Sequence, residues 1–129
     1  MRKPLLAVLA VAALALAGGD ALAAGDAAVG ADVFKKTCTT CHSNEAGVHT
    51  VGPSLFGVYG RKAGASDFPR YKGLVGADFT WNDALLDEYL ADPKAFVVAH
   101  TQNKTTAMTY KVKDAKDRED VIAYLKTLK

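Results

Sequence analysis

The chain has 129 residues, with 16 lysine and arginine residues against 14 aspartate and glutamate residues and a formal charge of +2. This length allows one small domain, and the nearly neutral balance excludes a nucleic-acid-binding protein that works through bulk positive charge. The acids gather at residues 78–92 and 114–120, so either an oriented dipole or an ordinary mixed surface fits the charge pattern.

The N-terminal segment has the three parts of a secretory signal peptide. These are a basic pair at residues 2–3, an apolar run at residues 5–17 and a small–x–small cleavage site at residues 21–23. The apolar run is shorter than the roughly 20 residues that span a bilayer, so an uncleaved membrane anchor is the weaker alternative. We therefore expect a cleaved signal at residues 1–23, ending near Ala23, and an exported mature domain at residues 24–129.

The mature chain begins with a predicted helix. Asp26 can cap it, and apolar residues at helical spacing extend to about Thr37. Gly30 lies inside this helix, where glycine costs about 1 kcal/mol relative to alanine. Either another element approaches closely at Gly30 or the glycine is merely tolerated.

Directly after this helix comes Cys38-Thr39-Thr40-Cys41-His42, which contains the only cysteines of the chain. A Cys-x-x-Cys-His sequence is the attachment signature of a c-type haem, in which each thiol bonds one vinyl group and the histidine ligates the iron. The alternatives are a thioredoxin-like redox pair, half of a zinc site, or a disulfide. The first needs a strand–helix–strand frame that the sequence lacks, and the second needs four suitably spaced ligands.

Residues 43–79 are rich in glycine, proline and polar residues and show no sustained periodicity. A loop region of this length is unusual in a small domain, and loops wrapped round a cofactor are a good explanation for it. His49 lies in this region, and we interpret it as a structural hydrogen-bonding histidine in preference to a ligand.

Three further helices are predicted. The first begins at the capping-box-like Thr80-Trp81-Asn82-Asp83, with Thr80 in the cap position, and places Trp81, Leu85 and Tyr89 on one face. Asp92 and Pro93 begin a short helix to about Ala99. The last begins near Ala115, with acids in its first turn and lysines at its end. No strand pattern appears, so we predict an all-α domain with long loops.

A six-coordinate haem needs a second axial ligand besides His42. Met108 is the leading candidate, because signal cleavage leaves it as the only methionine and it lies in a polar loop where a core methionine is not expected. His100 is an alternative ligand, and an open position that binds small molecules is another.

Several motifs together resemble the class I (monohaem) cytochromes c of the bacterial periplasmic long-loop type. They are Gly30 and Phe34 before the haem motif, the proline loop at residues 52–62, Trp81, the pair Tyr89-Leu90 before Asp92-Pro93, and the final helix at residues 118–126. The resemblance implies the cytochrome c fold, with three main helices plus short helices and long loops round one covalently bound haem c.

The resemblance also implies roles for individual residues. The Pro53 carbonyl would accept a hydrogen bond from His42, and His49 would tie two loops together. Gly30 would lie where the first and last helices cross. The remaining implied haem neighbours are Arg61, Trp81 and Tyr71 near a propionate, and Tyr89 near the Met108 sulfur. The chain departs from mitochondrial members in a longer stretch from Pro93 to Met108, which leaves the course of that loop open.

The implied function is that of a monomeric periplasmic electron carrier with no enzymatic activity, whose lysines meet acidic redox partners. Expected partners are a quinol–cytochrome c reductase, a terminal oxidase, a photosynthetic reaction centre or a periplasmic dehydrogenase, with no nucleic acid and with membranes reached only through these partners. The rival function is a haem enzyme or gas sensor with an open or His100-ligated distal site. A third possibility, thiol–disulfide exchange, predicts no haem spectrum.

Overall fold

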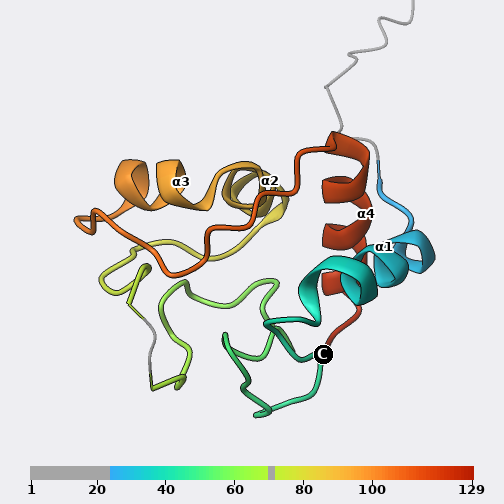
Figure 1. Ribbon diagram of the computed structural model, residues 1–129, viewed down its shortest axis with the longest axis horizontal. Coiled ribbons are helices and arrows are strands. Elements are labelled where there is room, and N and C mark those ends of the chain that lie inside the picture. The colour runs from blue at the N-terminus through green and yellow to red at the C-terminus, as the bar shows by residue number, and fades with distance from the viewer. Residues whose placement is uncertain (1–23, 70–71) are drawn as a thin grey trace, which may run out of the picture.

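The computed structural model describes residues 24–69 and 72–129, so the expected signal peptide and Tyr71 lie outside the described residues. Figure 1 shows the elements, which in chain order are α1 (Ala27–Val33), the π-helical turn η1 (Phe34–Cys38), α2 (Asp83–Ala91), α3 (Pro93–His100) and α4 (Ala115–Leu125). Within the described residues the only β pairing is one isolated bridge, between Lys62 and Thr80. The prediction of an all-α fold with long loops is confirmed.

Three helices begin at aspartate caps, of which the sequence predicts Asp26 and Asp92. The Asp26 carboxylate accepts hydrogen bonds from the backbone of Ala28 and Val29 at the start of α1. Asp92 caps α3 and Asp114 caps α4 in the same way. These side chains satisfy backbone N–H groups that have no partner within the helix, and their charge favours the positive helix end.

The predicted start of α2 is wrong by two residues. Asn82, and not Thr80, is its cap, because the Asn82 side chain accepts a hydrogen bond of 2.9 Å from the backbone of Leu85. Thr80 instead pairs with Lys62 in the isolated bridge. Both residue types cap helices well, so the long-range bridge decides which of them does so here.

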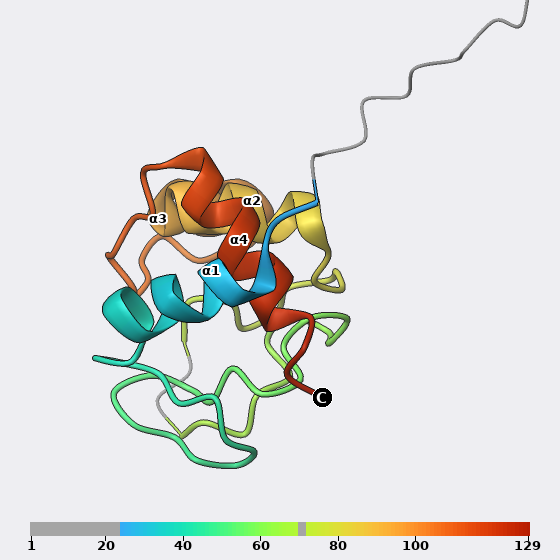
Figure 2. The same ribbon diagram turned by 90° about the vertical axis from the view of Figure 1, so that its right-hand side faces the viewer.

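The first and last helices cross at Gly30, as the resemblance implies, and Figure 2 shows α1 passing across α4. A Cβ atom built on Gly30 would lie 1.9 Å from the backbone oxygen of Asp120 and 2.9 Å from Cβ of Tyr124. Only glycine therefore permits this approach. The buried carboxylate of Asp120 also accepts a hydrogen bond of 2.7 Å from the backbone of Asp26, which fastens the start of α1 to α4.

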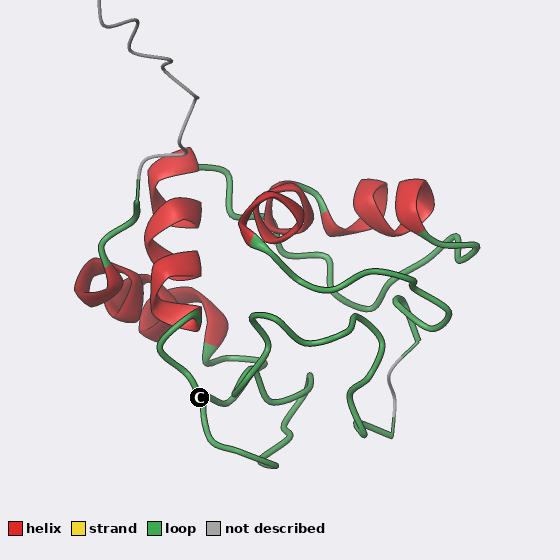
Figure 3. Cartoon of the chain, turned by 180° about the vertical axis from the view of Figure 1, so that it is seen from behind, coloured by secondary structure: helices red, strands yellow, loops and turns green. Residues whose placement is uncertain are grey.

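The long loops lie largely on one side of the molecule, with α2 and α3 on the other (Figures 1 and 3). A buried aromatic cluster supports α2 and α3 from within: the ring of Trp81, which is 4% exposed, stacks on Phe96 and meets Tyr89 edge to face at 5.2 Å. Such aromatic contacts combine large apolar burial with a fixed geometry. Among the described helices, none combines the length and the apolar character that crossing a bilayer requires.

Four acids on or next to α2 and α4 form ion pairs within the chain. The pairs are Asp83 with Lys126, Asp87 with Arg118, Asp92 with Lys111, and Asp120 with Lys116. Ion pairs near the surface add little stability, but each neutralises a charge that a partner would otherwise meet. The Asp120 carboxylate is the buried exception. Lysines 35, 36, 62 and 104 are exposed and appear in none of these pairs.

Candidate functional site

The haem-attachment motif begins at the end of a widened helical turn. In η1 the backbone N–H of Thr39 reaches back five residues to the carbonyl of Phe34. The chain then turns sharply, because the N–H groups of Cys41 and His42 both donate to the carbonyl of Cys38. Single π-helical turns are common at functional sites, and this one brings both cysteines and the histidine onto one compact turn.

A second loop holds this turn from the other side. The carbonyl of Cys41 accepts hydrogen bonds from the Thr50 hydroxyl (2.6 Å) and from the backbone of Gly52 (2.7 Å). The two cysteines form no disulfide with each other: Cys38 is half-buried and Cys41 is exposed. Burial raises the pKa of the Cys38 thiol above its ordinary value, so the neutral thiol is favoured.

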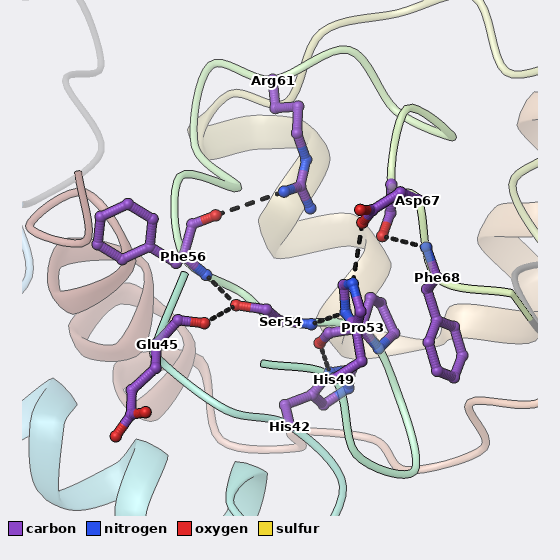
Figure 4. Close-up of polar contacts among 10 residues, drawn as sticks. His42, Glu45, His49, Pro53, Ser54, Phe56, Arg61, Asp67 and Phe68 are labelled. Carbon is purple, nitrogen blue, oxygen red and sulfur yellow. Dashed lines mark hydrogen bonds and ion pairs between the residues drawn. The ribbon is translucent and has the colours of Figure 1, made fainter. Parts of the chain in front are cut away.

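The His42 ring is oriented by a hydrogen bond to the backbone carbonyl of Pro53 (Figure 4). Nδ1 lies 2.7 Å from the Pro53 carbonyl oxygen, which can only accept, so Nδ1 carries the proton. Burial lowers the pKa of His42, while the bond to Pro53 acts in the opposite sense. The favoured form is therefore a neutral imidazole with a free lone pair on Nε2, which is the form that ligates iron.

The α-carbon of Gly52 packs closely against the same ring. A Cβ atom on Gly52 would approach Cε1 of His42 to 2.6 Å and Nδ1 to 3.0 Å. Sequence analysis did not single out this glycine, because nothing local shows that an imidazole covers its α-carbon. The thiols, the oriented imidazole and the glycine cradle fit a c-type haem, and the described residues contain no cluster of three or more His, Cys, Asp or Glu side chains that could hold a metal ion directly.

We expect Gly52→Ala to displace the His42 ring. The added methyl group overlaps the imidazole, so either the ring or the loop must move, at a cost of about 1–3 kcal/mol in the free energy of unfolding. Denaturant unfolding measures this loss, and NMR detects faster solvent exchange of the Nδ1 proton. Val51→Ala is the matched control, because Val51 is 66% exposed and its truncation leaves the ring contact intact. An unperturbed Nδ1 proton in Gly52→Ala would contradict the positioning role of this contact.

His49 is a structural residue, as predicted. Its Nδ1 accepts a hydrogen bond of 3.0 Å from the backbone of Ser54, and its Nε2–H donates to Asp67 at 2.9 Å (Figure 4). The ring also packs on Phe68, with centroids 5.5 Å apart. Both ring nitrogens are thus engaged, and His49 ties the proline loop to the loop at residues 66–68.

The other predicted haem neighbours are spread over several elements. Arg61 donates a long hydrogen bond of 3.4 Å to the carbonyl of Phe56, and its backbone carbonyl accepts from the N–H of Trp81 at 3.0 Å. Arg61 and Trp81 are therefore brought together. Tyr89 is half-buried on α2, where its ring meets those of Trp81 and Phe96. Their contacts with a haem remain predictions.

Met108 lies in the loop between α3 and α4, whereas His100 is the last residue of α3. Met108 is half-buried and packs against the main core, as Cys38 also does. The His100 ring instead stacks on Phe96, with centroids 4.1 Å apart, and its Nε2 lies 2.9 Å from the carboxylate of Glu88. These contacts on α2 and α3 occupy one ring nitrogen and one ring face, and they disfavour His100 as the second iron ligand.

Comparison with known proteins gives consistent results. A sequence model described as Cytochrome c matches residues 27–129. Cytochrome c2 of Rhodospirillum rubrum is 43% identical over 136 aligned residues that cover all of both chains. Cytochrome c-550 of Novispirillum itersonii is 43% identical over 81% of this chain and 100% of its own length.

Solved structures agree with the sequence matches. Cytochrome c2 from Rhodobacter sphaeroides superposes with a TM-score of 0.72 at 32% identity, covering 81% of this chain and 96% of that structure. Cytochrome cH from Methylobacterium extorquens superposes with a TM-score of 0.66 at 40% identity, covering 80% of this chain and 99% of that structure.

Proposed function

The chain belongs to the cytochrome c family, and from this membership we propose that it works in the periplasm as a single-electron carrier between redox proteins. Members of this family carry one covalently bound haem c, and the iron supplies the reversible one-electron change. The observation that carries the proposal is the His42 geometry. A neutral imidazole, with Nδ1 held by Pro53 and one face against Gly52, presents Nε2 in a fixed direction.

The chain's own residues then have distinct tasks. Cys38 and Cys41 would fasten the haem through thioether bonds, and His42 and Met108 would be the axial ligands of its iron. The Pro53 carbonyl fixes the imidazole and raises its basicity. The Met108 thioether favours reduced iron and so raises the potential.

The haem environment completes this assignment. We assign Arg61, Trp81 and Tyr71 to the neighbourhood of a propionate and Tyr89 to that of the Met108 sulfur. The backbone pairing of Arg61 with Trp81 and the ring contact of Trp81 with Tyr89 support a common site for these three described residues. Held rigidly in such packing, these residues reorganise little when the iron changes charge.

Exposed lysines provide the docking charge. Lysines 35 and 36 lie on η1, directly before the cysteines, and Lys62 and Lys104 are exposed on loops. Lys111 is instead neutralised by Asp92, whose carboxylate lies 2.7 Å from the lysine nitrogen. The partners we propose are a quinol–cytochrome c reductase, a terminal oxidase, a photosynthetic reaction centre or a periplasmic dehydrogenase, met through fast, weak and salt-sensitive encounters.

We expect Lys35→Glu to slow electron transfer with a quinol–cytochrome c reductase by about tenfold at low salt, because attraction to an acidic partner becomes repulsion. The difference should vanish near 1 M ionic strength, where the Debye length is about 3 Å. Stopped-flow kinetics over a salt series measures it. Lys113→Glu is the matched control: it makes the same charge change at an exposed residue just before α4. Equal slowing by both variants would show that net charge, and not the η1 lysines, controls docking.

Optical spectra of periplasmically matured protein, oxidised and reduced, test the function as a whole. An electron carrier with two protein ligands shows a low-spin haem spectrum in both states and does not bind carbon monoxide rapidly when reduced at neutral pH. Rapid binding of carbon monoxide would mean an open iron position and would favour an enzyme or a gas sensor.

A further inference from the structure

The loop between α3 and α4 carries Met108, and its two ends are fixed by backbone contacts. At the start, the Thr101 N–H and hydroxyl both donate to the carbonyl of Val97 on α3. At the far end, the Val112 N–H donates to the carbonyl of Leu90 on α2 at 2.8 Å. Met108 lies between these two points. The mobility of its side chain therefore depends on contacts in the middle of the loop.

Asn103 makes that middle contact. Its side-chain amide donates to the carbonyl of Gly73 at 3.0 Å and to the carbonyl of Val75 at 2.9 Å. An amide NH2 group has two hydrogens, so its donor capacity is used completely on this one turn. The backbone N–H of Asn103 in turn donates to the Thr101 hydroxyl at 3.0 Å, which sets the direction of the side chain.

The turn that receives Asn103 is itself well anchored. Successive backbone hydrogen bonds close it, from Val75 to Lys72 and from Ala77 to Leu74, and the Leu74 side chain is only 5% exposed. A second contact lies three residues further along the loop. A Cβ atom on Gly73 would lie 2.7 Å from the hydroxyl oxygen of Thr106, so the loop approaches this turn as closely as glycine allows.

Thr106 then connects this contact to the ligand. Its hydroxyl accepts a hydrogen bond of 3.3 Å from the backbone N–H of Met108. The turn at residues 72–77, Asn103, Thr106 and Met108 therefore form one continuous chain of contacts. We propose that Asn103 is a positioning residue that clamps the Met108 loop and thereby limits how readily Met108 leaves the iron.

This inference deepens the proposed function and rests on its assignment of Met108 as a ligand. A neutral thioether is a replaceable ligand, and an external base can take its place only when the loop swings outward. Outward movement breaks both Asn103 hydrogen bonds, so their removal favours the displaced state. Loss of two neutral hydrogen bonds predicts that the ferric protein binds imidazole about tenfold more tightly.

The test uses the haem-loaded protein with Asn103→Asp and Asn103→Ala. The first variant keeps the side-chain size but presents oxygen to two carbonyl oxygens and has no donor, and the second removes the group. Gln102→Ala is the matched control, because Gln102 is the exposed neighbour in the same loop. Two quantities are measured: imidazole affinity of the ferric protein, and amide hydrogen exchange at residues 104–108. Helical circular dichroism checks that each variant is folded.

Both Asn103 variants should show faster exchange at residues 104–108 and about tenfold tighter imidazole binding, with Gln102→Ala matching the wild type. Unchanged exchange overturns the clamp itself. Faster exchange with unchanged imidazole affinity overturns its link to Met108. Failure of the ligand assignment is a separate outcome. In that case the ferric wild type lacks the sulfur–iron band and Met108→Ala leaves the potential unchanged, while amide exchange at residues 104–108 is still faster in the Asn103 variants.

Discussion

We expect replacement of Met108 with alanine to abolish the red-region absorption band of a sulfur–iron bond in the ferric protein and to lower the reduction potential. The fall should amount to tenths of a volt, within the roughly 0.8 V range over which axial ligands set haem potentials. The physical reason is that a neutral thioether favours reduced iron, and the water or other small ligand that replaces it does not. The side chain is half-buried against the core, so its truncation also leaves room there for a small ligand.

Optical spectra and redox titration measure both changes, and the reduced variant should bind carbon monoxide rapidly. Thr109→Ala is the matched control, since Thr109 is the exposed residue next in the chain and its hydroxyl has no place in the proposed coordination. If the ferric wild type lacked the red-region band and Met108→Ala left the potential unchanged, another residue would be the ligand. His100 would then have to give up both its Glu88 and its Phe96 contacts to serve.

The second large effect is expected at the crossing of α1 and α4. Gly30→Ala should lower the free energy of unfolding by about 3 kcal/mol, although alanine is the better helix former. The added Cβ atom would overlap the backbone oxygen of Asp120, and backbone cannot rotate away as a flexible side chain can. The two helices would have to separate, which would also strain the hydrogen bond from Asp26 to Asp120 and the contact between the Phe34 and Tyr124 rings.

Denaturant unfolding of the haem-loaded protein measures this effect. The exposed Ala28 on the same helix provides a calibration, because Ala28→Gly should cost about 1 kcal/mol from helix propensity alone. Gly30→Ala is the reverse substitution two residues away, so propensity by itself predicts stabilisation. A stabilised Gly30→Ala protein would mean that the helices can move apart at little cost.

Local chemistry made much of this fold predictable. The caps at Asp26, Asp92 and Asp114 act on the next three residues, so the sequence contains both the donor and the acceptor. The haem motif is equally local. The role of Gly30 became clear only through family resemblance, because glycine in a helix indicates either tolerance or close approach until the neighbouring element is known.

The features that could not be predicted depend on distant residues. Thr80 was the wrong cap because its pairing with Lys62 lies outside the local pattern. Gly52 matters only because the His42 ring covers it, ten positions away in sequence, and Asn103 only because the carbonyls of Gly73 and Val75 face it. No pattern along the chain marks an amide whose acceptors come from another loop. The longer loop before Met108 was the least predictable part for this reason.

The crossing of α1 and α4 also constrains the order in which the protein can be made. Asp26 and Asp120 are 94 residues apart, so the first helix emerges from synthesis long before its partner exists. Contacts of such large sequence separation form late, because the chain between them must first be closed into a loop. During that interval α1 has no α4 to pack on. The close approach at Gly30, with the hydrogen bond from Asp26 to Asp120, therefore forms only after the last helix has been made.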